Sequence, residues 1–333
     1  MTTKTSVQPL LTDRIRDAVQ QAIQAPSNHN TQPWLFRIRN DGVELIADKQ
    51  RACRVVDPDD RELYISCGAA LYQLRLAMKA DGLATLVTIL PSHSDPDLVA
   101  RVLVAGSHIP SSDEQTLLDA IPQRRTNRFP FESREVDPGL QVEWMSDVRS
   151  EHAWIHYFQT DQQKHAVADL VSEGDRLQAS DRHFRRELAK WVHSNQSSRR
   201  DGLPGYTHGV SDFASNFDSF LVRTFDWGDG KAAKDRQLAQ GSPLLAVIGT
   251  RTDTMADWIA SGQALAKMLL RAASWSVDAS FLNQPIEVET LRTKLMDLTG
   301  NEGVPQILLR LGYGSEVKPT PRRPLDEVIL EQD

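Results

Sequence analysis

The chain has 333 residues, enough for one large domain or two ordinary ones, and its 40% hydrophobic and 25% charged residues are typical of globular proteins. Acidic residues outnumber basic ones by 45 to 38, and the net charge of −7 argues against general affinity for nucleic acid or anionic membranes. No stretch approaches the roughly 20 apolar residues that span a bilayer, and the N-terminus lacks the apolar core of a secretion signal. Cys53 and Cys67 show no metal-ligand spacing. We predict a cytoplasmic protein with two reduced thiols, and the sequence leaves a disulfide between them open.

The first part of the chain alternates helix and strand patterns. Apolar residues recur at helical spacing over residues 11–25, and Pro26 ends that run. Asn40, Asp41 and Gly42 separate two strand-like runs, which indicates a hairpin. The other predicted elements are a polar loop after Pro26, strands at 35–38, 43–47, 83–90 and 98–106, and a helix at 60–80 that ends near Gly82.

The second part of the chain partly repeats this order. Helices are predicted over 113–121, 161–192 and 255–274, and strands over 153–158, 243–250 and 304–314. Residues 193–242 are rich in Gly, Ser, Asn and Asp and carry few regular apolar repeats. A long irregular stretch inside a compact domain is usually functional, so we predict a lid over a site here, with Trp227 as its notable aromatic residue.

An internal repeat links the two parts. Residues 65–83 align with 259–277 without gaps, and five of the 19 positions are identical. QPWLFRI at 32–38 can be laid on HAWIHYF at 152–158, and a strand ending in LVAG is echoed by one ending in LRLG. The repeat predicts a first half at 1–121 and a second half at 122–333, ahead of the alternative of one α+β domain with coincidental similarity.

The two halves carry different polar motifs. The first half has the loop PSNHNTQPW from Pro26, whereas its counterpart in the second half, MSDVRSEHA, has lost those polar residues. The second half opens with RRTNR at 124–128, to which the first half has no clear equivalent. Each half therefore carries one part of a site that the other lacks.

The arginine motifs are suited to a phosphate group. RRTNR places three guanidinium groups beside Thr126 and Asn127, and Arg322 and Arg323 form a second pair between prolines. Guanidinium forks match phosphate oxygens, and each charge-assisted bond contributes roughly 1.5–3 kcal/mol. An arginine cluster taken alone is more often a solvated basic patch, so neither pair decides the function by itself.

The loop from Pro26 is suited to a planar heterocycle. Amide and hydroxyl side chains follow one another between two prolines, and such a rigid polar loop can pair with alternating donors and acceptors. The same residues are also those of an ordinary helix-to-strand turn. No GxGxxG, P-loop or metal-ligand spacing occurs, so those classes of site are not supported.

Three motifs together resemble the flavin-dependent nitroreductase family. APSNHNTQPW looks like its loop after the first helix, RRTNR resembles its arginine-rich N-terminal motif, and LRLGYG…PTPRRPLDEVI looks like its C-terminal segment. Their order and spacing, over roughly residues 11–330, resemble the Acg-type branch, a tandem fusion of two nitroreductase halves. The long stretch at 193–242 is not part of a minimal nitroreductase.

The resemblance implies an α+β fold with central mixed or antiparallel sheets flanked by helices, duplicated in one chain as a pseudo-dimer, and one FMN bound between the halves. The flavin carries the chemistry, and no side chain acts as a general acid. A backbone N–H of 279–284 would face flavin N5, and no metal is implied. The cofactor residues carried over by the resemblance are Pro26, Ser27, Asn28, Asn30, Arg124, Arg125, Thr126, Asn127, Arg128, Ala279, Ser280, Arg322 and Arg323.

The prediction for function is an FMN-binding oxidoreductase that uses NAD(P)H to reduce small nitroaromatic or quinone-like acceptors. The alternative is a protein that stores or sequesters FMN under a lid with little turnover. A scaffold without a ligand ranks last, because both arginine clusters would have to be solvated. The chain is predicted to be a monomer that forms a pseudo-dimer, or a weak homodimer, with no nucleic acid or membrane partner.

Overall fold

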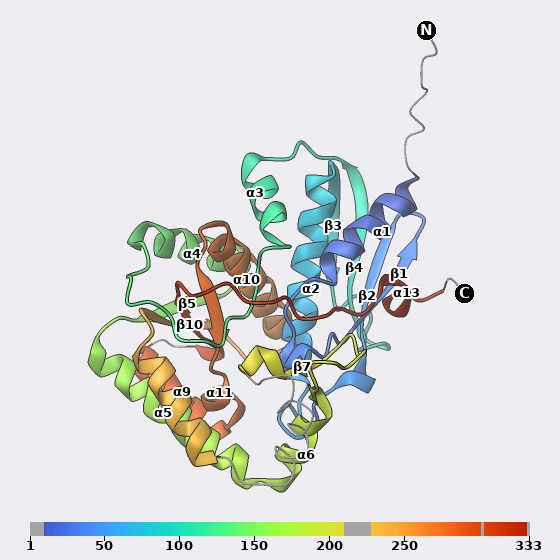
Figure 1. Cartoon of the computed structure of the whole chain (residues 1–333). Coiled ribbons are helices and arrows are strands. Elements are labelled where there is room, and N and C mark those ends of the chain that lie inside the picture. The colour runs from blue at the N-terminus through green and yellow to red at the C-terminus, as the bar shows by residue number, and fades with distance from the viewer. Residues whose placement is uncertain (1–9, 210–227, 301–302, 332–333) are drawn as a thin grey trace.

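Two four-stranded sheets form the framework of the molecule. The structure is a computed structural model that describes residues 10–209, 228–300 and 303–331. Within each large sheet every pair of neighbouring strands is antiparallel, and helices flank both sheets (Figure 1). The α+β class predicted from the sequence is confirmed.

The first sheet has the strand order β1-β2-β4-β3. The Asn40-Asp41 turn joins its first two strands, as predicted. The elements in chain order are α1 (Leu11–Ala22), the short helix η1 (Asn28–Asn30), β1 (Trp34–Arg39), β2 (Gly42–Ala47), η2 (Lys49–Arg51), α2 (Arg61–Ala80), β3 (Leu83–Ile89), β4 (Leu98–Ser107) and α3 (Ser112–Ala120).

The second sheet has the order β5-β8-β10-β9. A small two-stranded parallel sheet, β6-β7, lies apart from it. The elements are α4 (Pro138–Ser150), β5 (Trp154–Phe158), α5 (Asp161–Ser180), α6 (Arg182–Trp191), β6 (Val192–His193), β7 (Leu203–Pro204), η3 (Gly205–His208), α9 (Gly228–Gln240), β8 (Leu244–Thr250), α10 (Met255–Ser274), β9 (Asp278–Phe281), α11 (Gln284–Glu287), α12 (Glu289–Thr299), β10 (Val304–Gly312) and α13 (Leu325–Val328).

The two sheets share one topology. In each half two strands are followed by a 20-residue helix and then by two more strands, and the last strand lies inside the sheet. This equates β1 with β5, β2 with β8, α2 with α10, β3 with β9, and β4 with β10. The sequence segments aligned by the repeat fall on these equivalent strands and helices. The duplication stays a prediction, which this shared topology supports.

The central helices α2 and α10 pack closely through two glycines. A Cβ atom at Gly68 would collide with the backbone carbonyl of Ile259, and one at Gly262 would collide with that of Ile65. In the sequence repeat, Gly68 aligns with Gly262 and Ile65 aligns with Ile259. The contact is therefore reciprocal, as at a two-fold interface between identical subunits.

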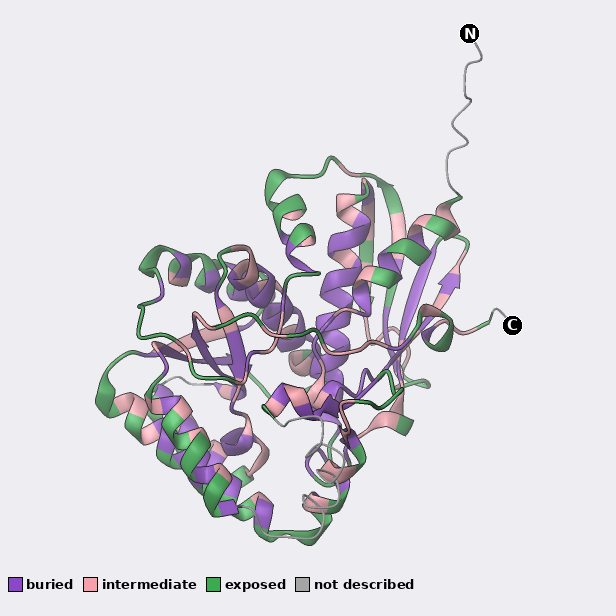
Figure 2. Ribbon diagram, viewed as in Figure 1, coloured by how far each residue is buried: buried purple, intermediate pink, exposed green. Residues whose placement is uncertain are grey.

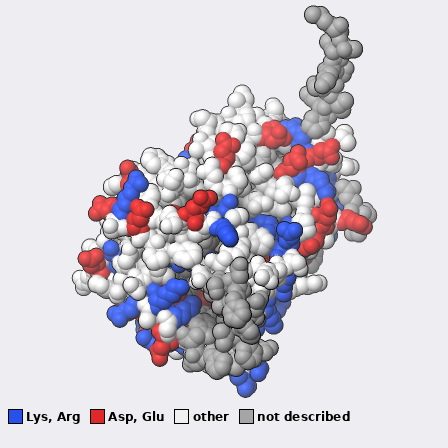
Figure 3. Space-filling model, in the orientation of Figure 1, with Lys and Arg blue, Asp and Glu red and all other residues white. Residues whose placement is uncertain are grey.

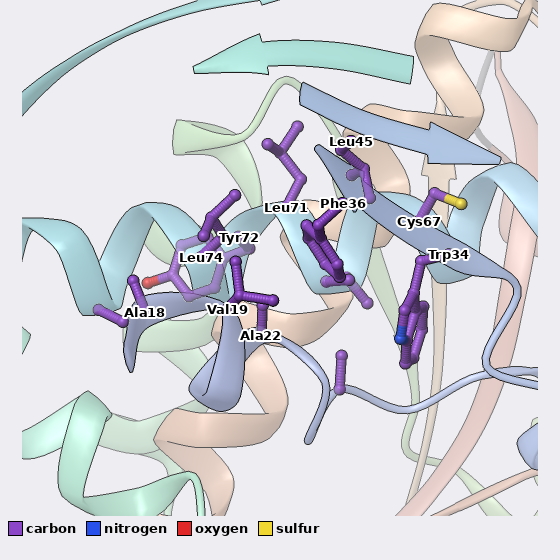
Figure 4. Close-up of a cluster of buried hydrophobic side chains, with 14 of the residues drawn as sticks. Ala18, Val19, Ala22, Trp34, Phe36, Leu45, Cys67, Leu71, Tyr72 and Leu74 are labelled. Atoms are coloured by element: carbon purple, nitrogen blue, oxygen red, sulfur yellow. The ribbon is translucent and has the colours of Figure 1, made fainter. Parts of the chain in front are cut away.

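Apolar burial is concentrated around these helices. Figure 2 shows α2 and α10 buried over most of their length, whereas α5 and α9 expose one side. In the first half, Phe36 from β1 lies between Val19 of α1 and Leu71 of α2, and Trp34 of the same strand is buried further along, on the side of Cys67 (Figure 4). This packing fixes both ends of the chain segment that follows α1, and so it positions the polar loop between them.

The C-terminal tail returns to the first half. From β10 it runs across the front of the molecule to α13 beside β1 (Figure 1). Phe36 forms a parallel bridge with Ile329, and the Leu330 N–H donates to the Phe36 carbonyl at 2.8 Å. Strands β1–β4 lie before residue 122 and β5–β10 after it, so the predicted division at 121/122 assigns each large sheet to one half. The tail, in contrast, belongs to the second half in sequence but packs against the first half.

Three sequence predictions are corrected. The helix predicted over 161–192 is two helices, because the Asp181 side chain accepts a hydrogen bond from the His183 N–H at 2.7 Å and starts α6. The irregular stretch predicted over 193–242 contains α9. MSDVRSEHA, the segment that the sequence repeat equates with the polar loop, includes the end of helix α4, and this helix was not predicted. Residues 210–227, with Trp227, lie outside the described residues.

Candidate functional site

Two adjoining cavities lie where the halves and the tail meet. The central cavity, of about 350 Å³, is lined by residues of the first half, including Ser27, Asn28 and Glu62, and of the second half, including Arg128 and Arg310. The tail cavity, of about 540 Å³, lies between α1, the segment 121–129, the short helix η3 and tail residues 316–322. Thr126 lines both cavities.

The tail cavity gathers the predicted phosphate ligands Arg124, Arg125 and Arg322, and Lys318 joins them. Its one acidic lining residue among the described residues is Glu316, which counteracts part of the charge of Arg125. Arg124 is only 6% exposed, and its Nε and Nη1 have no hydrogen-bond partner. Burial of such charge without a partner is costly, so the cavity is suited to an anion.

The pKa values of these arginines report the same crowding. Burial, followed by the neighbouring charges of Arg322 and Arg125, lowers the pKa of Arg124 to about 9. Burial and the charge of Arg125 lower the pKa of Arg322 to about 10. Both groups remain cationic at neutral pH. A bound anion would relieve their repulsion.

The polar loop after α1 is held in an unusual backbone conformation. His29, Asn30 and Gln32 have positive φ values of 45°, 56° and 54°. The Ser27 hydroxyl accepts from the Gln32 N–H at 2.9 Å, and the Asn28 N–H donates to the Ser66 hydroxyl at 3.2 Å. Such conformations persist only where surrounding bonds impose them, and they are common at binding sites.

Two amides of this loop bind other chain segments. Asn30 Nδ2 donates to the carbonyls of Gly202 at 3.0 Å and Pro321 at 3.1 Å, and its Oδ1 accepts from Arg322 at 3.0 Å. Gln32 Nε2 donates to the Arg200 carbonyl at 2.8 Å. Asn30, predicted to border a ligand, thus holds the tail and residues 200–202 against the loop and does not line either cavity.

The lining of the central cavity includes Pro26, Ser27 and Asn28 from this loop. Asn28 Nδ2 is buried without a partner, which leaves an amide donor for a ligand. Ser280 of β9 lines the cavity, whereas Ala279 packs in the core and its carbonyl accepts from the Asn127 N–H at 3.0 Å.

The side chains of Asn127 and Arg323 hydrogen-bond to other segments of the chain. Asn127 Nδ2 donates to Asp278 and to the Ser315 carbonyl, each at 2.9 Å. Arg323 is 7% exposed and donates to the carbonyls of Gln32 at 3.2 Å and Glu327 at 2.9 Å. Neither residue lines the central cavity or the tail cavity. Of the two tail arginines, it is Arg322 that lines the tail cavity.

Arg310 is a cavity residue that the sequence did not single out. It is 1% exposed, its Nη2 donates to the carbonyls of Asn127 and Phe129 at 3.0 Å, and its Nε and Nη1 have no partner. The Arg128 side chain makes no hydrogen bond or ion pair with any residue that the structure describes. Burial lowers the pKa of each to about 10, so both carry positive charge into the central cavity.

The remaining polar lining is mixed in sign. His29 stays neutral near pH 7, because burial and the charge of Arg128 lower its pKa to about 4. Burial also lowers the pKa of His208. Two acids that the sequence did not indicate, Glu62 and Glu287, lie at the same cavity. No group of potential metal ligands occurs among the described residues.

The face of the molecule drawn in Figure 3 carries charges of both signs. Figure 3 shows Lys and Arg interspersed with Asp and Glu over the face drawn. Among the described residues, no helix has the length and apolar character needed to cross a bilayer.

Comparison with known proteins places the chain in a family. It is 30% identical over 327 residues to "Putative NAD(P)H nitroreductase Rv3131" of Mycobacterium tuberculosis, covering 95% of this chain and 91% of that one. It is also 30% identical to "Putative NAD(P)H nitroreductase acg" of the same organism, over 96% of each chain. The chain belongs to this nitroreductase family, and the resemblance to the Acg-type branch is confirmed.

Solved structures are more distant. The "FMN and NADPH-dependent nitroreductase NfnB" from sphigopyxis sp. strain HMH is 18% identical and has a TM-score of 0.43, covering 65% of this chain and 99% of that chain. No protein-family model matches the chain.

Proposed function

We propose that the chain binds one FMN across the two cavities and acts as an NAD(P)H-dependent reductase of small nitroaromatic or quinone-like acceptors. The observation that carries this proposal is the set of buried, unpartnered guanidinium nitrogens of Arg124 and Arg322 in a cavity that adjoins a second, mixed cavity. The names of the family members, as NAD(P)H nitroreductases, support the reductase activity.

The residues fit the two ends of the cofactor. Arg124, Arg125 and Arg322 would hold the phosphate, and Thr126 lies where the two cavities adjoin. Ser27, Asn28 and Ser280 offer hydroxyl and amide groups to the ring. This assignment retains most of the predicted ligands, and it treats Asn30, Asn127, Ala279 and Arg323 as residues that position them.

The chain's own contribution to catalysis is electrostatic. Bound FMN would supply the hydride transfer between NAD(P)H and the acceptor. Arg128 and Arg310 place positive charge in the cavity proposed for the ring, where charge aimed at a developing anion favours reduction. The apolar lining of the cavity, which includes Ile65 and Leu265, limits the water that would screen this charge.

Storage of FMN is the second candidate, and the contacts of residues 200–206 favour it. The Gly202 carbonyl accepts a hydrogen bond from Asn30, and the Arg51 side chain forms an ion pair with Asp201. The Tyr206 hydroxyl donates to the Pro319 carbonyl at 2.8 Å. These bonds fasten the start of the predicted lid to the first half and to the tail. A ligand covered in this way would exchange slowly.

Flavin uptake and flavin reduction test these two readings separately. The purified protein is expected to be yellow, or to become yellow with added FMN, and a colourless protein that takes up no FMN would refute both. Anaerobic mixing of the holoprotein with NADPH then divides them. Rapid bleaching of the flavin supports the reductase, whereas bleaching by dithionite alone supports storage.

The assembly and location follow from the same proposal. Both halves contribute to the cavities within one chain, so we propose a monomeric pseudo-dimer. Cys53 and Cys67 are free and buried, as expected for a protein of the reducing cytoplasm. Gel filtration at several protein concentrations tests the monomer, since a weak homodimer would elute earlier as concentration rises.

A further inference from the structure

Two glutamates from different halves face each other at the central cavity. Glu62 lies in the first turn of α2 and Glu287 is the last residue of α11. Both line the cavity, and their carboxyl groups are within hydrogen-bonding reach of each other. Glu62 is only 4% exposed, so water cannot separate its charge from that of its partner.

The hydrogen bonds around the pair leave one oxygen of Glu62 free. Its Oε1 accepts from Arg61 Nη2 and from Asn283 Nδ2, each at 3.1 Å, whereas its Oε2 is buried without a partner. Glu287 Oε2 accepts from Gln178 Nε2. Two carboxylates this close cannot both stay ionised when they are buried. If one of them is protonated, its O–H can donate a hydrogen bond to an oxygen of the other.

The charges around the pair do not remove this need for a proton. Arg61 and Lys231 favour the ionised forms, and Arg292 also faces Glu62, whereas Asp57 opposes ionisation of Glu287. Burial, followed by the charge of Glu287, raises the pKa of Glu62 to about 8, and burial raises that of Glu287. The two groups titrate as one unit.

We propose that Glu62 and Glu287 share one proton at neutral pH and donate it to the acceptor that is reduced in the central cavity. The inference rests on the proposed function, and it makes the pair catalytic residues of that reaction. It also replaces the expectation from the sequence that no side chain acts as a general acid.

The proton balance of the reaction requires such a donor. A nitro group that gains a hydride and a proton gives a nitroso group and water, and a quinone that gains both gives a hydroquinone. NAD(P)H is the source of the hydride and its electron pair. The proton comes from the pair: a carboxyl O–H bond breaks, an O–H bond forms on the acceptor, and water restores the proton to the pair.

Other protonatable groups at the cavity are less suited to this step. His29 is already deprotonated near neutral pH, and the arginines hold their protons too tightly. Lys231 is engaged in ion pairs with Asp175 and Asp235. Compared with these groups, the glutamate pair offers a proton that can leave near neutral pH.

Infrared spectroscopy of the protein without added flavin tests the shared proton. The wild type is expected to show a protonated-carboxyl band at neutral pH that shifts in D₂O. The band should lose intensity in Glu62→Gln and in Glu287→Gln, with the contribution of other buried acids such as Asp57 remaining, and it should be unchanged in Glu289→Gln, whose parent residue is exposed on α12. A wild-type spectrum without the band, or a band of undiminished intensity in both pair variants, overturns the inference and leaves the proposed function intact.

Reoxidation of the reduced holoprotein tests proton delivery. A quinone takes a hydride and a proton, whereas ferricyanide takes single electrons and no proton. Loss of a general acid typically slows its step by 10²–10⁴-fold, so each pair variant should slow reoxidation by quinone about 100-fold and leave the ferricyanide rate within about twofold. Equal rates with quinone in wild type and both variants contradict proton delivery. A wild type that binds no FMN, or never reduces quinone, instead overturns the proposed function.

Discussion

The two halves of the chain share a framework but carry different polar motifs. Equivalent strands and central helices give both halves one topology, and Gly68 and Gly262 contact each other's helices in the same way. The polar loop of the first half has no counterpart before β5, where α4 ends at Ser150 and only a short turn follows. The arginine segment 124–128 has no clear equivalent in the first half.

This difference fits the predicted duplication, in which one site needs only one copy of each motif. In a dimer of identical subunits, every residue that reaches across the interface occurs twice. In the duplicated chain that we predict, either copy could be lost, provided that the remaining loop and the remaining arginines meet. Here they meet at the cavities, and the returning tail supplies Arg322 to the same place.

The largest predicted effect is on phosphate recognition by the second half and the tail. Replacing both Arg124 and Arg322 by alanine removes two charge-assisted contacts of about 1.5–3 kcal/mol each, so FMN affinity should fall by about 10²–10⁴-fold. Riboflavin, which lacks the phosphate, should bind both proteins within a few-fold. Titration of flavin fluorescence measures both affinities.

Arg149→Ala is the matched control, because Arg149 is exposed on α4 and lines neither cavity. It should bind FMN as the wild type does. If the double variant lost riboflavin as strongly as FMN, the tail cavity would not be the phosphate site, and the division between the cavities would fail.

The next effect is on the shared framework. Gly68→Ala and Gly262→Ala each force a methyl group against the backbone of the other central helix. Overpacking of this kind typically costs about 1–3 kcal/mol, so each change should lower the melting temperature by several degrees, and by similar amounts. Gly230→Ala in α9 meets no atom within 4 Å and should be neutral or slightly stabilising. Markedly unequal effects at Gly68 and Gly262 would show that the contact is not reciprocal in energy.

Much of this framework could be predicted from the sequence. Short apolar runs indicated the strands near 35–38 and 243–250, and apolar residues at helical spacing indicated both central helices. The helix α9 was missed because its buried positions include only small residues, Gly228, Ala232 and Ala239, which give little apolar signal. The break at Asp181 was missed because the residues on both sides of it have the composition and apolar spacing of helices.

The site was only partly predictable, for a physical reason. Arginines that cluster in sequence, such as Arg124 and Arg125, are visible as a motif. Arg310 is a single charge in an apolar strand, and Glu62 is an acid in a first helical turn, where acids are common for the helix dipole alone. Their role depends on burial at a cavity between the halves, and no local pattern encodes that burial.

A smaller effect is expected for the charge next to the proposed ring. Arg128→Ala removes a cation that favours the reduced, negatively charged flavin, so the midpoint potential should fall by roughly 30 mV for each 1.4 kcal/mol lost. Arg124→Ala should leave the potential nearly unchanged, since it lines only the tail cavity. Dithionite titration with a reference dye measures both. Equal shifts in the two variants would remove the distinction between the cavities.

The last effect concerns the pH dependence of stability without flavin, and it develops gradually over several pH units. The pKa of Glu62 is raised to about 8, chiefly by burial, so the folded chain retains a proton that the unfolded chain releases near pH 4.5. Between these values the folded state binds more protons, and stability must therefore fall as pH rises, by at most about 1.4 kcal/mol per pH unit for this group. Glu62→Gln should flatten the decline in melting temperature between pH 5 and 8.

The slope will not vanish in that variant, because two other buried acids behave alike. Burial raises the pKa of Asp57 to about 7 and that of Asp175 to about 6. Glu289→Gln, exposed on α12, should keep the wild-type slope. A Glu62→Gln variant as pH-dependent as the wild type would mean that Glu62 is ionised in the folded chain, which would contradict a proton held on Glu62.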